Sequence, residues 1–206
     1  DGKTIGQGLD EMDKIAKETL DDTFRTALTG DSKEYRESSS SLMFAFVLAI
    51  LLIYLILAAQ FESFKDPLII MLTVPLAIAG ALIFMYFNDI TMNIFSQIGI
   101  IMLIGLVAKN GILIVEFANL KQEAGEDKME AIKDASLQRL RPILMTSAST
   151  ILGLIPLAFA SGEGCNQRIA MGTAVVGGML VSTFLTMYIV PAIYSYVSTN
   201  RSKLKK

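Results

Sequence analysis

Five long stretches with few or no charged residues constrain the fold of this chain more than any other feature. Each is long enough to cross the hydrocarbon of a bilayer, since a membrane-spanning α-helix needs about 20 predominantly apolar residues. Four carry no charge, and the third is broken only by Lys109 and Glu116. The sequence therefore predicts an all-α integral membrane protein with five transmembrane helices, at residues 38–61, 67–88, 90–118, 142–162 and 169–196.

The composition excludes several classes of soluble protein. Hydrophobic residues make up 52% of the 206 residues, whereas an ordinary soluble domain has about 45–50% even when glycine is counted. The 18 basic residues are spread over several loops, so we expect no nucleic-acid partner. There is no histidine and one cysteine, Cys165, and the methionines are scattered among Leu and Ile. We therefore expect no enzyme activity, no cofactor and no metal site.

The segments outside the five stretches are polar. Residues 1–37 carry apolar side chains at helical spacing and predict an amphipathic helix that covers a surface. Residues 119–141 predict a second amphipathic helix along the membrane interface, or a solvated linker. Residues 197–206 form a basic tail. Because the chain opens at Asp1 with no initiator Met and no signal peptide, we interpret it as part of something larger.

The distribution of basic residues predicts the orientation. With five spans the two ends lie on opposite sides of the membrane, and by the positive-inside rule the side with more Lys and Arg in its short loops is cytoplasmic. One side has only Arg168. The other has Lys65, Lys121, Lys128, Lys133, Arg139, Arg141, Arg201, Lys203, Lys205 and Lys206. We therefore expect residues 1–37 on the outer side of the membrane, and the connector and the C-terminus on the cytoplasmic side.

Lys109 is the most informative residue within the spans. A charge in hydrocarbon costs at least about 2.5–3.5 kcal/mol, so it persists where it is paired, hydrated or useful. On a helix it shares a face with Met102, Gly105, Leu113 and Glu116. Glu116 lies about 10.5 Å along the axis, too far for a tight bond. Lys109 could snorkel to the cytoplasmic interface, but we favour a buried functional role.

A second polar stripe runs along the fourth span. It comprises Arg139, Pro142, Thr146, Ser149, Thr150 and Gly153. Close helix packing and interhelical hydrogen bonds explain most of this stripe. They do not explain why Arg139 begins it, where its guanidinium could reach into the bundle. In the fifth span, Gly172, Ala174, Gly177 and Gly178 predict close helix contact.

Four segments resemble one family closely. These are GLVAKNGILIVEFAN at 105–119, RLRPILMTS at 139–147, AAQFESF at 58–64 and VPLAIAGA at 74–81. They are similar to the C-terminal membrane half of resistance-nodulation-division multidrug exporters, of the hydrophobe/amphiphile branch. The resemblance covers nearly the whole chain and is weakest in residues 1–30.

This resemblance implies a larger assembly. The five spans would be helices eight to twelve of a twelve-helix bundle with a pseudo-twofold repeat, and residues 1–37 the end of a periplasmic porter region. Such exporters are homotrimers of the bacterial inner membrane, driven by proton influx. They take drugs from the periplasm or outer leaflet and pass them to a periplasmic adaptor and an outer-membrane channel.

The resemblance also assigns roles to individual residues. Lys109 matches the relay lysine of the family, Asn110 its neighbour, Arg139 the relay arginine and Thr146 the relay threonine. We expect supporting roles for Glu116 and Thr150. The family's proton-binding aspartate pair lies on the fourth helix and is absent from this sequence. The N-terminal half of the transporter is therefore the expected partner of Lys109.

Two other functions are compatible with the sequence. One is a related proton-driven exporter of lipid or protein, which the drug-pump-like Lys-Asn and Arg-Leu-Arg-Pro motifs disfavour. The other is a non-transporting membrane scaffold or sensor, which would not require Lys109 and Arg139 on stripes that face the bundle. The substrate range is not encoded in these residues.

Overall fold

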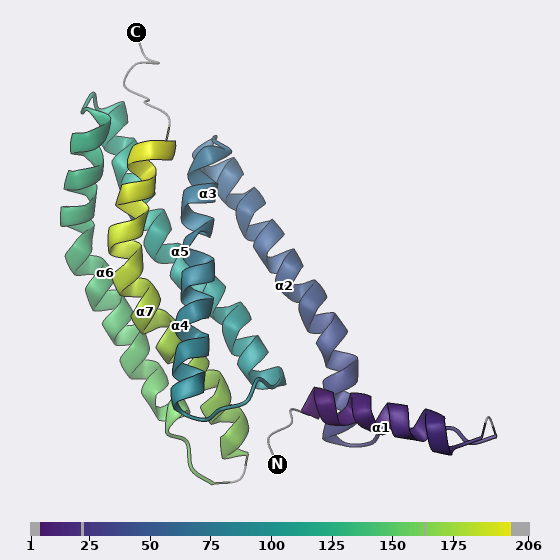
Figure 1. The fold of residues 1–206 in the computed structure, drawn as a ribbon. Coiled ribbons are helices and arrows are strands. Elements are labelled where there is room, and N and C mark those ends of the chain that lie inside the picture. Colours follow the sequence, from purple (N-terminus) through teal and green to yellow (C-terminus); the bar gives the residue numbers. More distant parts are fainter. Residues whose placement is uncertain (1–4, 22, 163, 199–206) are drawn as a thin grey trace.

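The computed structural model describes residues 5–21, 23–162 and 164–198, which form seven α-helices and no strand (Figure 1). The helices are α1 (Ile5–Thr19), α2 (Asp31–Phe61), α3 (Lys65–Met71), α4 (Thr73–Phe87), α5 (Ile94–Glu123), α6 (Lys128–Ala158) and α7 (Cys165–Val197). Five membrane-length apolar segments result, formed by α2, α3 with α4, α5, α6 and α7. The all-α membrane fold is thereby confirmed. Most of the expected tail, beyond residue 198, lies outside the described residues.

A proline divides the second span into α3 and α4. Pro75 has no backbone N–H and cannot bond the carbonyl of Met71, so the ladder of helical hydrogen bonds is interrupted there. The break falls at Leu72. The Thr73 hydroxyl donates to the carbonyl of Ile70 at 2.6 Å and satisfies one of the groups at the break.

Local polar side chains cap the first turns of both α5 and α6. At the start of α5, the Asn93 side chain accepts from the Ser96 amide at 2.8 Å, and the Ser96 hydroxyl accepts from the Asn93 amide at 2.9 Å, a reciprocal cap. Asp127 caps α6 by accepting from the Met129 amide at 3.2 Å. The turn between the two helices contains Gly125, with φ of 102°.

The connector expected at 119–141 does not form a separate helix. Residues 119–123 complete α5, and residues 128–141 are the first part of α6, which continues through Pro142. The reason is burial: Ile132 and Ala135 share one core cluster with Ile143, so the first half of α6 packs on the bundle along the same face as the second.

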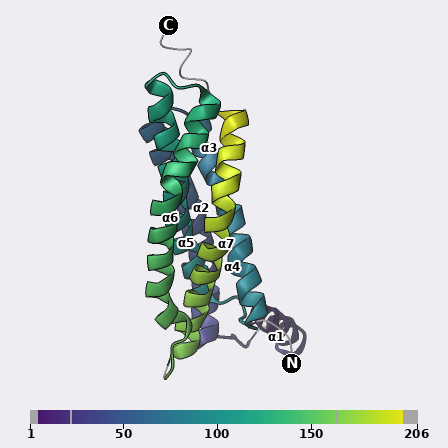
Figure 2. The same ribbon diagram turned by 90° about the vertical axis from the view of Figure 1, so that its left-hand side faces the viewer.

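Helix α7 lies between α4 and α6 in both views of the ribbon (Figures 1 and 2). Its glycines make this possible. A methyl group at Gly172 would lie 2.5 Å from the Ala158 nitrogen, and one at Gly177 would lie 2.2 Å from Cβ of Phe84. The prediction of close helix contact in the fifth span is confirmed.

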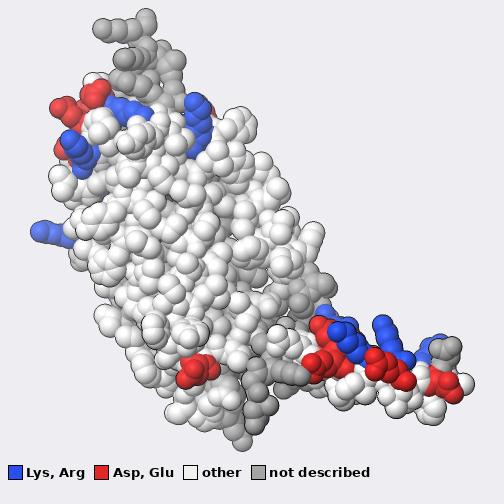
Figure 3. Space-filling model, viewed as in Figure 1, with Lys and Arg blue, Asp and Glu red and all other residues white. Residues whose placement is uncertain are grey.

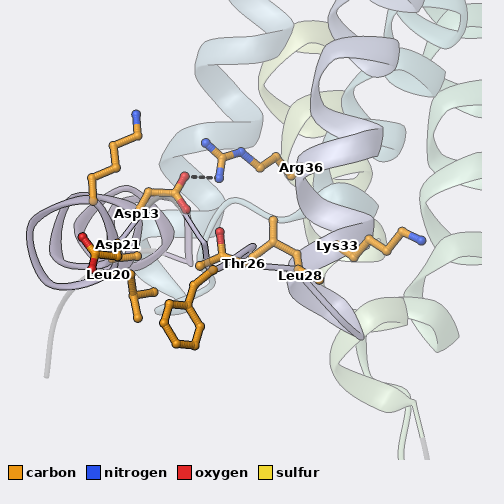
Figure 4. A pocket seen from close by; sticks show the side chains of 11 residues that line it. Asp13, Leu20, Asp21, Thr26, Leu28, Lys33 and Arg36 are labelled. Carbon is orange, nitrogen blue, oxygen red and sulfur yellow. Dashed lines mark hydrogen bonds and ion pairs between the residues drawn. The ribbon is translucent and has the colours of Figure 1, made fainter.

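Helix α1 stands apart from the packed bundle, and α2 is buried in it mainly near its C-terminal end, at Leu57 and Phe61. Only 6% of the most apolar stretch of α2 is buried, against 56% for α5 and for α7. Helix α1 crosses near the start of α2 (Figure 1), where the Arg36 guanidinium donates to the Asp13 carboxylate (Figure 4). This hydrogen bond raises the pKa of Arg36 above its ordinary value. The apolar side chains of α1, such as Met12 and Ile15, are exposed.

Charged side chains gather at the two ends of the molecule. On the face drawn in Figure 3, most of them lie on α1 at one end and near the α5–α6 turn at the other, with few charged side chains between. This is the distribution expected for a bundle whose middle lies in hydrocarbon.

A buried polar network closes the bundle at the end opposite α1. Asp66, only 1% exposed, accepts from the Asn119 amide at 3.1 Å and from the Ser198 hydroxyl at 3.2 Å. The Tyr194 hydroxyl donates to the Asn119 carbonyl oxygen and accepts from the Gln122 amide at 2.8 Å. Helices α3, α5 and α7 are thereby joined by side-chain hydrogen bonds. From the sequence, Asp66 belonged only to the polar segment between the first two predicted spans.

We expect Tyr194→Phe to destabilise the bundle by about 1–3 kcal/mol, since it leaves buried partners of the hydroxyl unsatisfied. The measurement is the Tm of the purified protein in detergent. Tyr196→Phe is the matched control, because Tyr196 is 89% exposed and should lose no buried hydrogen bond. Equal Tm values for the two variants would contradict the role assigned to the network.

Candidate functional site

Lys109 lies on a face of α5 that the other described helices leave open. Lys109 and Glu116 are exposed, as are Met102 and Gly105, while Leu113 is half-buried. Among the described residues, neither Lys109 nor Glu116 has a hydrogen bond or ion pair. The separation along the helix explains why they do not bind each other, as the sequence predicted.

The position of Lys109 along α5 bears on the snorkelling alternative. Residue 109 is 15 residues from the first residue of α5 and 14 from the last. At 1.5 Å per residue it is about 21 Å from the nearer end of the helix. Lys109 therefore lies in the central part of α5, and snorkelling to a membrane interface stays an alternative prediction for it.

Asn110 points in a different direction from Lys109. It is buried, at 3% exposure, and its side-chain amide donates to the Ser147 hydroxyl on α6 at 3.2 Å. This hydrogen bond fixes the position of α5 along α6 at the residue next to Lys109. Ser147 was not singled out in the sequence, although it follows Ile143 by one helical turn on the buried face of α6.

The Asn110–Ser147 bond also places Lys109 and Thr146 on one side of the helix pair. Helices α5 and α6 run in opposite directions along the bundle (Figure 1). In antiparallel helices, the residues that directly precede two facing partners turn to the same side. A shift of seven residues is nearly two full helical turns, so it returns a side chain to about the same side. Glu116 on α5 and Arg139 on α6 therefore also lie on this side.

Arg139 is held by an aromatic ring. Its Cζ lies 4.5 Å from the centroid of the Phe117 ring, and its Nε is buried with no hydrogen-bond partner among the described residues. Arg141, two residues later, is exposed. Of the two arginines beside Leu140, Arg139 is therefore the one that is partly buried within the helix pair.

The hydroxyls of the fourth span bond to their own helix. The Thr146 hydroxyl donates to the carbonyl of Ile143 at 3.2 Å, and the Thr150 hydroxyl donates to the carbonyl of Thr146 at 2.8 Å. Thr146, Ser149 and Gly153 are exposed. The part of the stripe from 146 to 153 thus makes no side-chain bond to another described helix.

We define the uncovered face as the surface formed by Met102, Gly105, Lys109 and Glu116 of α5 together with Thr146, Ser149 and Gly153 of α6. A methyl group added at Gly105 or Gly153 would meet no atom within 4 Å, whereas one at Gly111 would meet Ile70 at 3.2 Å. The structure brings Arg139 and Phe117 together, and Asn110 and Ser147 together. It does not bond Lys109 to Arg139 or Thr146.

Three residues that the sequence did not single out belong to this region or its surroundings: Ser147, Phe117 and Asp66. Phe117 was counted among the apolar residues of the span, and a cation over a ring has no signature in linear spacing. Among the described residues, no three His, Cys, Asp or Glu side chains are grouped to hold a metal ion.

Comparison with known proteins gives one consistent result. A model described as the AcrB/AcrD/AcrF family matches residues 1–198. A Haemophilus influenzae protein named only as an uncharacterized transporter is 38% identical over 210 residues, covering 98% of this chain and 20% of that protein.

Two further relatives have more specific names. The toluene efflux pump membrane transporter TtgB of Pseudomonas putida is 40% identical over 198 residues, covering 96% of this chain and 19% of the relative. The multidrug resistance protein MdtF of Escherichia coli is 39% identical over 207 residues, covering 100% and 20%. The chain spans about a fifth of the length of these curated relatives.

Proposed function

The chain belongs to the AcrB/AcrD/AcrF family, and from this membership we propose that it forms the C-terminal membrane part of a proton-driven exporter of drugs and other amphiphiles. The observation that carries the proposal is Lys109: a cation at the midpoint of a membrane-length helix, on the uncovered face, with no partner among the described residues. A charge in that position needs a partner, and the rest of the protein must supply it.

The uncovered face supports a carboxylate-bearing helix as this partner. Lys109 and Arg139 supply two cations on one side of the α5–α6 pair, and Gly105 and Gly153 leave room for close approach of a backbone. We propose that the N-terminal half of the transporter covers this face and presents its acidic pair to Lys109. Asn110 fixes the level of Lys109 through Ser147, while Thr146 and Arg139 complete the relay, with Glu116 and Thr150 in support.

The chemistry follows from charge. An ammonium group beside ionised carboxylates lowers their pKa and binds them while they are charged. When a carboxylate takes up a proton, the attraction to Lys109 falls and the lysine is released. This local charge change biases the packing of two helix bundles against each other, and cycles of protonation would couple proton influx to export.

The assembly and location follow from the same membership. We propose a homotrimer in the bacterial inner membrane that works with a periplasmic adaptor and an outer-membrane channel. Residues 1–37 would lie in the periplasm and the α5–α6 turn in the cytoplasm, in keeping with the positive-inside rule. TtgB is named for toluene and MdtF for multidrug resistance, which supports amphiphiles as the substrate class.

We expect cells that express the complete protein with its adaptor and channel to extrude an amphiphilic fluorescent dye, in a strain deleted for its own exporters. A protonophore should stop the extrusion, because the pump depends on proton influx. The measurement is the rate of loss of dye fluorescence from preloaded cells. Extrusion that continues at the same rate after the proton gradient has collapsed would contradict proton coupling, and a scaffold or sensor would show no extrusion at all.

A further inference from the structure

The Phe117 ring contacts two cations. Arg139 Cζ lies 4.5 Å from its centroid and Lys121 Nζ lies 5.9 Å from it. Phe117 itself is half-buried on α5 and packs against the larger core cluster. Packing against the core therefore holds the ring in place, so that it can position the cation that lies over it.

The two cations differ in how their charge is balanced. Lys121 Nζ binds Glu126 and Asp134, each at 2.9 Å. Arg139 makes no ion pair among the described residues, and its Nε is buried without an acceptor. The neighbouring carboxylate, Glu116, does not bind it. Among the described residues, the Phe117 ring is the only group whose negative face offsets the partial loss of hydration of the Arg139 cation.

We propose that Phe117 is a positioning residue for proton coupling: its ring holds the Arg139 guanidinium at the edge of the uncovered face, oriented for the acidic pair of the N-terminal half. The proposal rests on the proposed function, which assigns Arg139 to the proton relay. Stacking on a ring suits this task because it orients a planar cation without consuming its charge in an ion pair. The terminal N–H groups stay available to a carboxylate.

The neutralised Lys121 is part of the same arrangement. An unpaired lysine beside the ring would repel the guanidinium. Because Glu126 and Asp134 balance its charge, the cation of Arg139 remains the unbalanced one at this site. An acidic group that approaches the uncovered face would therefore be attracted to Arg139 rather than to Lys121.

The experiment compares Phe117→Leu, which keeps apolar bulk but removes the π face, with Phe117→Tyr, which keeps the ring. We measure proton-coupled dye export by the complete transporter as a function of pH. With Arg139 displaced, the relay carboxylates lose part of the nearby positive charge, so their pKa rises and the export profile shifts to higher pH. Phe117→Leu should show this shift with an export rate lowered about five-fold, and Phe117→Tyr should keep the wild-type profile.

Phe84→Leu is the matched control, because Phe84 is also half-buried but packs on Gly177, with no cation over its ring among the described residues. It should leave the pH profile unchanged. A wild-type profile in Phe117→Leu, or the same shift in Phe84→Leu or Phe117→Tyr, overturns the proposal. If Phe117→Leu does not assemble, Phe117→Met supplies a second ring deletion with an adaptable apolar side chain.

Arg139→Gln separates this proposal from the proposed function. If Arg139→Gln exports at the wild-type rate, the assignment of Arg139 to the relay is wrong and the positioning role falls with it. If Arg139→Gln abolishes export while Phe117→Leu is normal, only the positioning role is wrong. We expect Arg139→Gln to lose export. Any residual export in this variant should show no further pH shift when Phe117→Leu is combined with it.

Discussion

Replacing Lys109 with alanine is expected to abolish proton-coupled export while the protein still folds and assembles. The ammonium group has no partner among the described residues, and removing it leaves no described hydrogen-bonding group unsatisfied. The described helices should therefore lose no stabilising bond, and the acidic pair can take up protons in place of the lost cation. Export should fall to the level of cells without the transporter, because no cation remains to bind and release the acidic pair.

Dye extrusion, Tm and oligomeric state of the Lys109→Ala protein are the measurements. Lys133→Ala is the control, since Lys133 is an exposed lysine near the start of α6, away from the uncovered face, and its loss should leave export unchanged. Wild-type extrusion by Lys109→Ala would exclude the lysine from the relay. Loss of the assembled protein would show instead that Lys109 is structural.

Much of the fold could be predicted from the length of the apolar stretches. An uncharged run of membrane length has few alternatives to a spanning helix, and the described helices supply five such segments. The glycines of α7 were equally informative, because small residues at helical spacing indicate close approach of a second backbone, and Gly172 lies against Ala158.

Helix boundaries and buried polar pairs were harder to predict. The charges of residues 121–141 suggested a connector, but Ile132 and Ala135 are buried, and tertiary packing extends α6 past Pro142. Asp66 looked like part of a polar loop because its partners, Asn119 and Ser198, are far away in sequence. Such pairings depend on how the helices are placed in three dimensions, which spacing along one helix does not encode.

The candidate site was predicted from the sequence in part. The stripe around Lys109 was evident from helical periodicity, and the structure leaves it exposed. The partners that fix Asn110 and Arg139 lie on the neighbouring helix in each case, Ser147 on α6 and Phe117 on α5. The roles of Lys109, Asn110, Arg139 and Thr146 in proton relay rest on family resemblance and remain predictions for the experiments above.

Gly172→Ala is expected to destabilise the bundle by about 2–3 kcal/mol, even though it adds a single methyl group. That methyl would lie 2.5 Å from the Ala158 nitrogen, 2.7 Å from the Leu157 carbonyl carbon and 2.9 Å from the Ala158 Cα. All three atoms belong to the backbone of α6, which cannot rotate away as a side chain would. The helices must separate, and overpacking of this kind typically costs about 1–3 kcal/mol.

Gly111→Ala tests whether the rigidity of the neighbour determines this cost. It is also a glycine within a membrane-length helix, but its nearest neighbour is the Cγ2 of Ile70 at 3.2 Å, a side-chain atom that can move by a few tenths of an ångström. Replacing a helical glycine with alanine gains up to about 1 kcal/mol in helix propensity at either position. This gain should offset the small clash at Gly111 and leave a clear net loss at Gly172. Equal Tm values for the two variants would show that α6 can shift away from α7 at little cost.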